Sequence, residues 1–357
     1  MAKCIYREVT LNANKPADSD TATIEHIVPW SAGGSNGLVT PDVSKGANND
    51  LGSEVDAAFA NTLPIAIKRH QLQLEGQSGN ITPIVWRGTS PDGVKGTITI
   101  NADGVMDIVL DTAVQRPENG EVGPVSVAGS REKVEAILQG MLAGMKKRNQ
   151  IAYGQDGNLL DSLDAMMSAS EQTFVDSLRM TVEYFNQEAW TRGILKIALA
   201  AGHKLLGSDW TFGPDAAIFR QIVMNSRANW PKSSPRGFIA GELDRSVRLA
   251  LGKTATVRDK YQHTVAVMPM SDGRRGAIAV SLFGGNGVPE AMFPIGDLPR
   301  SFVDALNSKA YRDTVMGYRV DPQTRITVPI TFGEIDRRVT ARGPSNSRFR
   351  NAHVGRS

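Results

Sequence analysis

Apolar residues recur every three or four positions in several stretches of the chain, which is the spacing of amphipathic helices. The helices expected from this spacing cover residues 130–149, 158–168, 171–185, 188–206 and 214–225. Ser130 is a candidate N-cap for the first of them, Gly207 offers a stop for the fourth, and Pro214 can occupy the first turn of the fifth. The middle of the chain is therefore predicted to be helical.

Short apolar runs predict strands on both sides of this helical part. The stretch "KGTITINADGVMDIVL" (95–110) is typical of a hairpin whose turn contains Asp-Gly. Further strands are expected at 237–241, 263–269, 276–283 and 326–332. The second and third of these are joined by "SDGRRG", a loop with Asp-Gly, and are expected to pair as neighbours.

The composition is that of an ordinary soluble globular protein, with 41% hydrophobic, 22% charged and 6% aromatic residues in a chain of 357. The chain has no run of about 18 or more apolar residues and begins with no apolar signal core. The expected location is therefore the cytoplasm, with no membrane partner. Cys4 is the only cysteine, which excludes an intramolecular disulfide and a zinc site built from several cysteines.

The net charge of +3 is unevenly distributed along the chain. Residues 1–90 hold seven basic and nine acidic residues, whereas residues 337–357 hold six arginines and no acid. Such an arginine-rich, weakly apolar end is expected to be flexible. Two interpretations stay open for it: a solubilising terminus, or an arm that grips nucleic-acid phosphates.

Candidate catalytic residues gather in residues 23–59, where the apolar run "IEHIVP" precedes a glycine-rich loop, a second short run and a helix entry. Glu25 and His26 are neighbours, so a regular strand points them to opposite faces and a shared site needs irregular backbone. A neutral imidazole can take a proton from water, and a divalent cation on carboxylate and amide oxygens can stabilise a leaving oxyanion. The pattern fits metal-assisted cleavage of a phosphodiester.

These residues resemble the HNH, or ββα-metal, endonucleases. The blocks of one branch of that family occur in order here, as "EHIVP" (25–29), "GG" (33–34), "SNGLVT" (35–40) and "NNDLGSEVD" (48–56). The later segment "IKRHQLQLEGQSGNITP" (67–83) is also similar to that branch. The resemblance covers about the first 90 residues, and the combination of blocks makes it specific, since each block alone is weak.

The resemblance implies a role for each candidate site residue. His26 would be the general base that activates water, and Glu25 would ligate the metal directly or through water. Asn48 would be the second protein ligand, with Asn49 as the alternative if the alignment is shifted by one residue. Asn36 would brace the loop through hydrogen bonds. The implied cofactor is Mg²⁺, Mn²⁺ or another divalent cation.

The chain departs from the family in one respect that affects how the unit is held together. Many members carry two Cys-x-x-Cys pairs around a structural zinc. Here Cys4 stands alone at the place of the first pair, and "VSKGAN" stands where the second would be. No structural zinc is therefore expected, so the glycine loop must be held by hydrogen bonds and by packing against the downstream sheet.

The predicted fold class is α+β, with an N-terminal ββα-metal (HNH) unit, a small β-sheet region and a larger mixed α/β C-terminal domain whose first half is helical. The predicted boundaries are 1–90 for the HNH nuclease domain, 91–129 for the β-rich extension, 130–336 for the C-terminal domain and 337–357 for the basic tail. Target recognition or assembly is the role expected of the C-terminal domain.

The expected function is a divalent-metal-dependent endonuclease that hydrolyses double-stranded DNA. By analogy of architecture it would be restriction-like or serve anti-phage defence. A homodimer would help such an enzyme to cut both strands, although no heptad pattern indicates how a dimer would form. Two alternatives remain: an RNase, and a non-catalytic nucleic-acid-binding or assembly protein that retains the HNH scaffold.

Overall fold

The computed structural model describes residues 2–12, 18–76, 78–90, 93–115, 125–154, 156–169, 186–231, 239–241, 261–270 and 272–340. Its contacts divide the chain into two units. Unit 1 joins Met1–Thr82 to Tyr184–Ser357, and unit 2 is Pro83–Glu183. Unit 2 is thus an insertion in the chain of unit 1.

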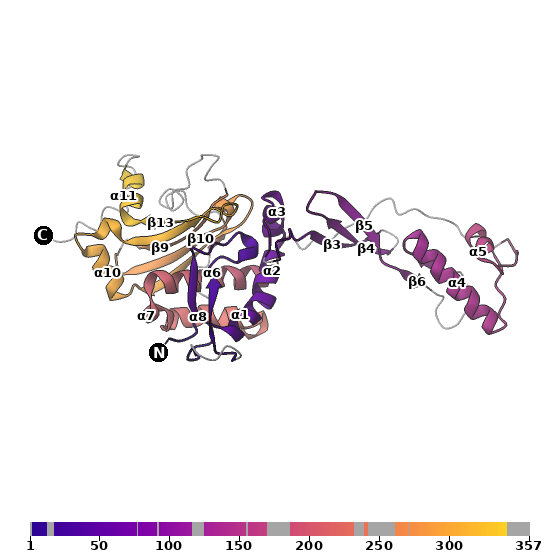
Figure 1. Ribbon diagram of the computed structural model, residues 1–357, viewed down its shortest axis with the longest axis horizontal. Helices are drawn as coiled ribbons and strands as arrows, with labels where there is room; N and C mark the ends of the chain where they lie inside the picture. The colour runs from indigo at the N-terminus through magenta and orange to yellow at the C-terminus, as the bar shows by residue number, and fades with distance from the viewer. Residues whose placement is uncertain are drawn as a thin grey trace. The chain divides into compact units, whose positions relative to one another are not determined.

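The N-terminal part of unit 1 contains the predicted ββα unit (Figure 1). Its elements are β1 (Ala22–His26), β2 (Val39–Ser44), α1 (Lys45–Leu51), the π-helical turn η2 (Gly52–Asp56), α2 (Ala57–Ala60) and α3 (Leu63–Gln71). The two strands pair antiparallel, with a register irregularity between Thr23 and Glu25. The Ser44 side chain accepts a hydrogen bond from the Ala47 N–H and so caps α1 directly after the second strand.

The C-terminal part of unit 1 forms a six-stranded antiparallel sheet in the order β13-β12-β9-β10-β11-β8. Its strands are β8 (Ile239–Gly241), β9 (His263–Pro269), β10 (Arg275–Ser281), β11 (Glu290–Asp297), β12 (Val315–Val320) and β13 (Thr327–Thr331). The expected pairing of β9 with β10 through the Asp-Gly loop is confirmed. Central strands β9 and β10 are buried along almost their whole length, which agrees with their continuous apolar sequences.

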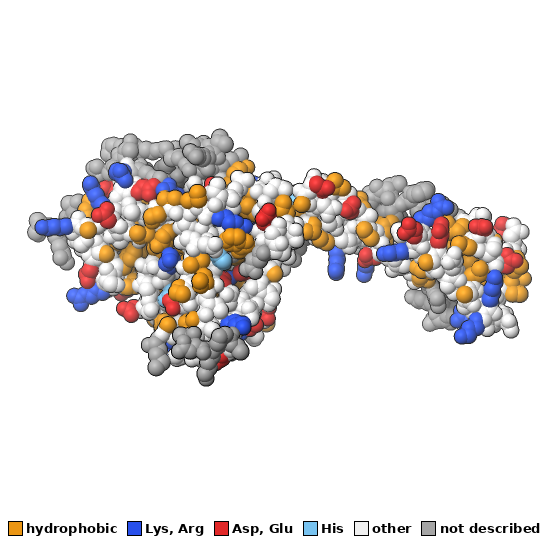
Figure 2. All heavy atoms as spheres, in the orientation of Figure 1, with side chains coloured by type: hydrophobic (Ala, Val, Ile, Leu, Met, Phe, Trp, Pro, Cys, Tyr) orange, Lys and Arg blue, Asp and Glu red, His pale blue; other side chains and the backbone are white. Residues whose placement is uncertain are grey.

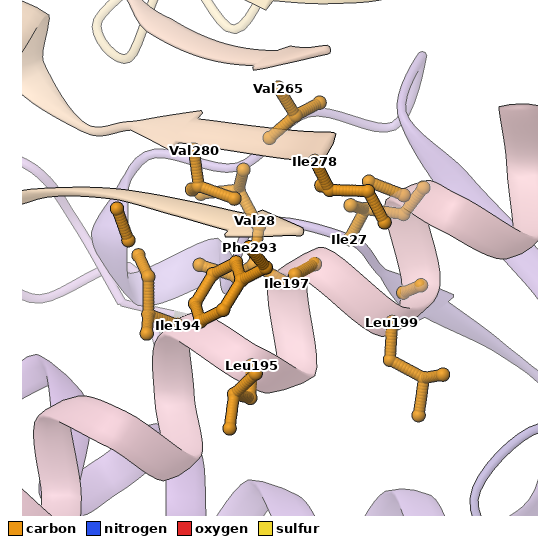
Figure 3. Close-up of a cluster of buried hydrophobic side chains, with 14 of the residues drawn as sticks. Ile27, Val28, Ile194, Leu195, Ile197, Leu199, Val265, Ile278, Val280 and Phe293 are labelled. Atoms are coloured by element: carbon orange, nitrogen blue, oxygen red, sulfur yellow. The ribbon is translucent and has the colours of Figure 1, made fainter. Parts of the chain in front are cut away.

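Helix α6 (Gln187–Leu206) is the centre of unit 1, and it is buried on nearly every side. It contacts β9, β10 and β12 of the large sheet as well as η2 and α2 of the N-terminal part. Figure 1 shows it running beneath the sheet, and Figure 3 shows its apolar side chains meeting Ile27 and Val28 as well as the sheet. A helix that is apolar all round requires such partners on all sides. One hydrophobic core therefore joins both ends of the chain.

The described part of unit 1 also contains shorter helices. They are α7 (Ser208–Thr211), α8 (Pro214–Met224), α10 (Arg300–Asn307) and α11 (Phe332–Thr340), with 3₁₀ turns η1 (Trp30–Ala32), η4 (Arg227–Asn229), η6 (Phe283–Gly285) and η7 (Tyr311–Asp313). Helix α8 packs on α6. Across the described ranges of both units, every helix is too short or too polar to span a bilayer.

In its described residues, unit 2 combines two small antiparallel sheets with two helices. The elements are β3 (Ile84–Thr89), β4 (Lys95–Ile100), β5 (Met106–Leu110), β6 (Ala113–Gln115), β7 (Ser126–Ala128), α4 (Arg131–Lys147) and α5 (Leu163–Ala169). Strands β3, β4 and β5 form one sheet in that order, while β6 pairs with β7. Helix α4 packs against α5 and β7.

Most of the elements that periodicity predicts are present. The hairpin at 95–110 and the helices α4, α6 and α8 lie where the apolar spacing places them. The helix expected at 171–185 falls outside the described residues. The prediction missed β3, β11, β12, α10 and α11. Helix α11 runs to Thr340, past residue 337, where the tail was predicted to begin.

The contacts divide the chain at positions other than the predicted boundaries. Helices α4 and α5 belong with the small sheets of unit 2, whereas α6 begins a return to unit 1. Periodicity identifies a buried helix such as α6 but does not identify what buries it. Here the partners include the N-terminal unit, from which α6 is separated by more than a hundred residues of sequence.

The close approach of α6 to α2 yields a test of this packing. A Cβ at Gly193 would lie 2.3 Å from the ring of Phe59, so Gly193→Ala should destabilise unit 1 by about 1–3 kcal/mol. The control is Gly52→Ala, because Gly52 is helical and a Cβ there meets nothing within 4 Å. That change should instead stabilise by about 0.5–1 kcal/mol. Urea unfolding of both variants measures the difference, and equal midpoints would contradict the packing.

Candidate functional site

The His26 imidazole lies beside the side chain of Asn36, which belongs to the loop between β1 and β2. Its Nε2 is 2.9 Å from Asn36 Oδ1. Because an amide oxygen only accepts hydrogen bonds, Nε2 carries the proton and the lone pair of the neutral ring lies on Nδ1. Asn36 is exposed and His26 is partly exposed. The arrangement therefore provides a ring nitrogen that can accept a proton from water.

Asn48 belongs to α1, and its side chain lies against β1 beside Thr23 and Ile24, the residues before Glu25 and His26. Its Nδ2 donates to Thr23 Oγ1 at 3.1 Å and to the Ile24 carbonyl at 3.2 Å. Both amide hydrogens are thus used, and within the described part of the chain no donor is bonded to Oδ1. The Asn48 side chain is therefore held against β1, next to the residues that precede His26.

Glu25 points the other way, into the interior of unit 1. Its carboxylate is buried and forms an ion pair with the Nζ of Lys196. The same ammonium lies 2.7 Å from Oδ1 and 2.6 Å from Oδ2 of Asp56, at the end of the π-helical turn. Lys196 itself is fully buried in α6. Strand alternation thus separates the two neighbours, as the sequence suggested, in spite of the irregularity before Glu25.

Glu25, Lys196 and Asp56 form a buried triad, and the charge of each shifts the pKa values of its neighbours. Burial raises the pKa of the Glu25 carboxyl; Lys196 opposes that shift and Asp56 reinforces it, so the pKa stays above its usual range. Burial lowers the pKa of Lys196, but the carboxylates of Asp56 and Glu25 outweigh it and leave that pKa raised. Lys196 is therefore the charged centre of the group.

The candidate ligands fit a divalent cation unequally. Glu25 fits poorly, because a ligand must be deprotonated and the Lys196 ammonium beside it repels a cation. Asn48 fits, since its Oδ1 is a neutral hard donor that accepts no other bond from the described residues. Asn49 is exposed on α1, and its side chain makes no hydrogen bond within the described ranges. Those ranges contain no group of three or more His, Cys, Asp or Glu side chains suited to a metal.

Polar contacts between α6 and the N-terminal part extend beyond Lys196. His203 Nε2 lies 2.9 Å from Asp42 Oδ2 on β2, and Arg192 lies 3.7 Å from Glu54. Lys196 and Arg192 of this helix thus pair with acidic residues of the N-terminal part, and His203 forms a hydrogen bond with a third. On the face shown in Figure 2, Lys and Arg side chains lie among Asp and Glu side chains and do not gather over one element.

Sequence reasoning missed the residues that hold the site in place, above all Lys196. The available signal was a lysine in "GILKIALAAG", an otherwise apolar stretch of a helix. A charge in such a position is rarely buried without a partner. The sequence does not say which carboxylates it meets, since Glu25 and Asp56 lie far away along the chain.

Comparison with known proteins adds no relative: a scan against family models, a search of curated proteins and a search of solved structures each found no significant match.

The buried triad predicts a large stability effect at Lys196. Lys196→Met replaces the ammonium-bearing chain with an unbranched apolar chain one atom shorter, and leaves Glu25 buried without a counter-ion. Breaking a buried pair in this way should cost about 3–5 kcal/mol in unfolding free energy. Adding Glu25→Gln and Asp56→Asn to Lys196→Met should recover part of that loss. Urea unfolding at pH 7 measures both; a triple variant less stable than the single one would contradict the triad.

The same pair of proteins gives a pH dependence with a definite sign. The pKa of Lys196 is raised above its ordinary value of 10.5, so its contribution is present below that pH and is lost as the pH rises through the folded value. The stability difference between the wild type and Lys196→Met should therefore persist to about pH 10 and decline only at higher pH.

Proposed function

We propose that this chain is a divalent-metal-dependent HNH endonuclease that cuts DNA with His26 as the general base. The observation that carries the proposal is the hydrogen bond between His26 Nε2 and Asn36 Oδ1, which leaves Nδ1 as the basic nitrogen. It supports a general base at the end of β1 in a ββα unit, and the Asn48 oxygen beside the same strand supports a nearby ligand.

In this mechanism Nδ1 of His26 removes a proton from a water molecule as the water oxygen attacks phosphorus. The new P–O bond forms while one ester P–O bond breaks, and the proton stays on the imidazole until solvent takes it. Asn36 keeps the ring in the required tautomer through its Oδ1. A divalent cation, held by Asn48 and otherwise by water, would stabilise the charge on the leaving oxygen. Glu25 would anchor the strand to Lys196.

Double-stranded DNA is the proposed substrate, and the six arginines beyond residue 336 would add phosphate contacts that weaken with salt. A homodimer and a restriction-like or defensive role in the cytoplasm belong to the same proposal, by analogy of architecture. An RNase stays an alternative, because water activation beside a metal does not select the sugar.

A second candidate function has one observation in its favour. Glu25 is engaged by Lys196 and not by a site facing His26, which is what a ββα scaffold without a complete metal site would show. The chain would then bind nucleic acid or assemble subunits without cutting. Nuclease activity that requires Mg²⁺ or Mn²⁺ separates this function from the first.

His26→Ala tests the general base directly. Loss of a positioned base should lower the rate of plasmid nicking in Mg²⁺ or Mn²⁺ by about a hundred-fold or more. The variant should keep the wild-type unfolding midpoint, because His26 is only partly buried. His353→Ala, in the tail, serves as the matched histidine control. Matched DNA and RNA substrates in the same assay decide the sugar, and undiminished nicking by His26→Ala would remove the assignment.

Asn48→Ala and Asn49→Ala form a matched pair one residue apart on α1. Since the Asn48 side chain lies against β1 and the Asn49 side chain is exposed, Asn48→Ala should raise the Mg²⁺ concentration needed for half-maximal cleavage and Asn49→Ala should not. Metal titrations of the cleavage rate measure both. The reverse order would transfer the ligand role to Asn49.

A further inference from the structure

The turn between β12 and β13 lies directly on the glycine loop that follows β1. Arg325, in this turn, donates from Nη1 to the Trp30 carbonyl at 3.0 Å and to the Gly34 carbonyl at 2.9 Å. Its Nη2 donates to the carbonyl of Glu75, after α3, at 2.9 Å. One guanidinium therefore joins three backbone positions in two separate segments of the N-terminal part.

The guanidinium also lies over the indole of Trp30, 3.5 Å from the ring centroid. A planar guanidinium can donate along its edge and stack through its face at the same time, whereas an ammonium cannot. The Trp30 ring in turn lies 5.1 Å from the His26 ring, centroid to centroid. A continuous set of contacts thus runs from Arg325 through Trp30 to the imidazole.

The fit between turn and loop is close elsewhere as well. A Cβ at Gly33 would come 2.5 Å from the Cβ of Pro322, and the glycine has φ +89°, so no other residue is well accommodated there. The Ser35 hydroxyl donates to the Arg325 carbonyl. Arg325 itself has φ +57°, an unfavourable backbone for arginine that surrounding contacts must maintain.

We propose that Arg325 is a positioning residue for the reaction of His26, and this rests on the proposed nuclease function. By fixing the carbonyl of Trp30 at the start of η1, the carbonyl of Gly34 after it and the face of the Trp30 ring, the guanidinium restricts the loop that borders the imidazole. In this proposal the β12–β13 turn holds the loop in one conformation, a role that the zinc bound by two cysteine pairs would have in many HNH endonucleases. A loose loop would leave the ring present but poorly aimed, and misplacement by about 1 Å costs up to a hundred-fold in rate.

Two substitutions, made in the full chain, distinguish the effect of the Arg325 guanidinium from the effect of its positive-φ backbone. Arg325→Gly relieves the positive φ and removes the guanidinium, while Arg325→Lys keeps the charge and cannot make the stack and the three bonds together. Arg300→Gly is the control, because Arg300 is 95% exposed at the start of α10. Each protein is assayed for plasmid cleavage in Mg²⁺, for its unfolding midpoint, and by NMR of labelled histidine rings assigned with His26→Ala.

Both Arg325 variants are expected to lower kcat by about ten- to a hundred-fold with KM little changed, and to shift or broaden the His26 ring signals below the unfolding temperature. Unchanged His26 signals and unchanged kcat in Arg325→Lys would overturn the proposal even if Arg325→Gly failed to fold. If the wild type cuts no DNA but the His26 signals still shift in the variants, the nuclease function is refuted. The contact by which Arg325 positions His26 is then still supported. A lower midpoint with unmoved ring signals would show a purely structural arginine and also overturn it.

Discussion

The buried ammonium of Lys196 is the interaction on which the rest of unit 1 depends. It meets Glu25 of β1 and Asp56 of the π-helical turn, so one atom on α6 joins three elements of the fold. Removing these charges from water is costly, and only mutual pairing in this geometry offsets the cost. The α6 helix cannot move away from β1 without leaving carboxylates and an ammonium unpaired in the interior. The N-terminal ββα unit is therefore tied to the C-terminal part of the chain by charge as well as by apolar packing.

Because side chains alternate along a strand, the buried contact of Glu25 with Lys196 also fixes the direction of its exposed-side neighbour on β1. Glu25 faces Lys196, so its neighbour His26 must face the opposite side, where Asn36 orients it. The loop after the strand is held from another direction, by Arg325 and by His263, whose Nε2 lies 2.8 Å from the Ala32 carbonyl. An imidazole bordered by two independent supports is more restricted than one on a free loop. Such restriction is what a general base requires if it is to act in one geometry.

The sequence predicted the local elements of this arrangement better than their partners. The apolar spacing of α6 and the Asp-Gly hairpin are local signals, and each produced the element expected of it. The block order around His26 and Asn36 led to two side chains that the fold does bring together. The destination of Glu25 could not be predicted, because Lys196 is 171 positions away and no local pattern encodes that contact. The sequences of the missed strands β11 and β12 show little alternation of apolar and polar residues. Their strand structure therefore becomes evident only from their pairing in the sheet.

Holding a small ββα unit with cations from the same chain differs physically from holding it with a metal. A zinc bound by four nearby thiolates stabilises the unit on its own, because binding energy and fold are local. Here the stabilising cations are Lys196 and Arg325, which come from α6 and from the β12–β13 turn. The contacts that hold the unit thus come from segments that lie much later in the chain. Both cations belong to unit 1, whereas residues 83–183 form unit 2. A change in α6 or in the β12–β13 turn therefore reaches the candidate site directly.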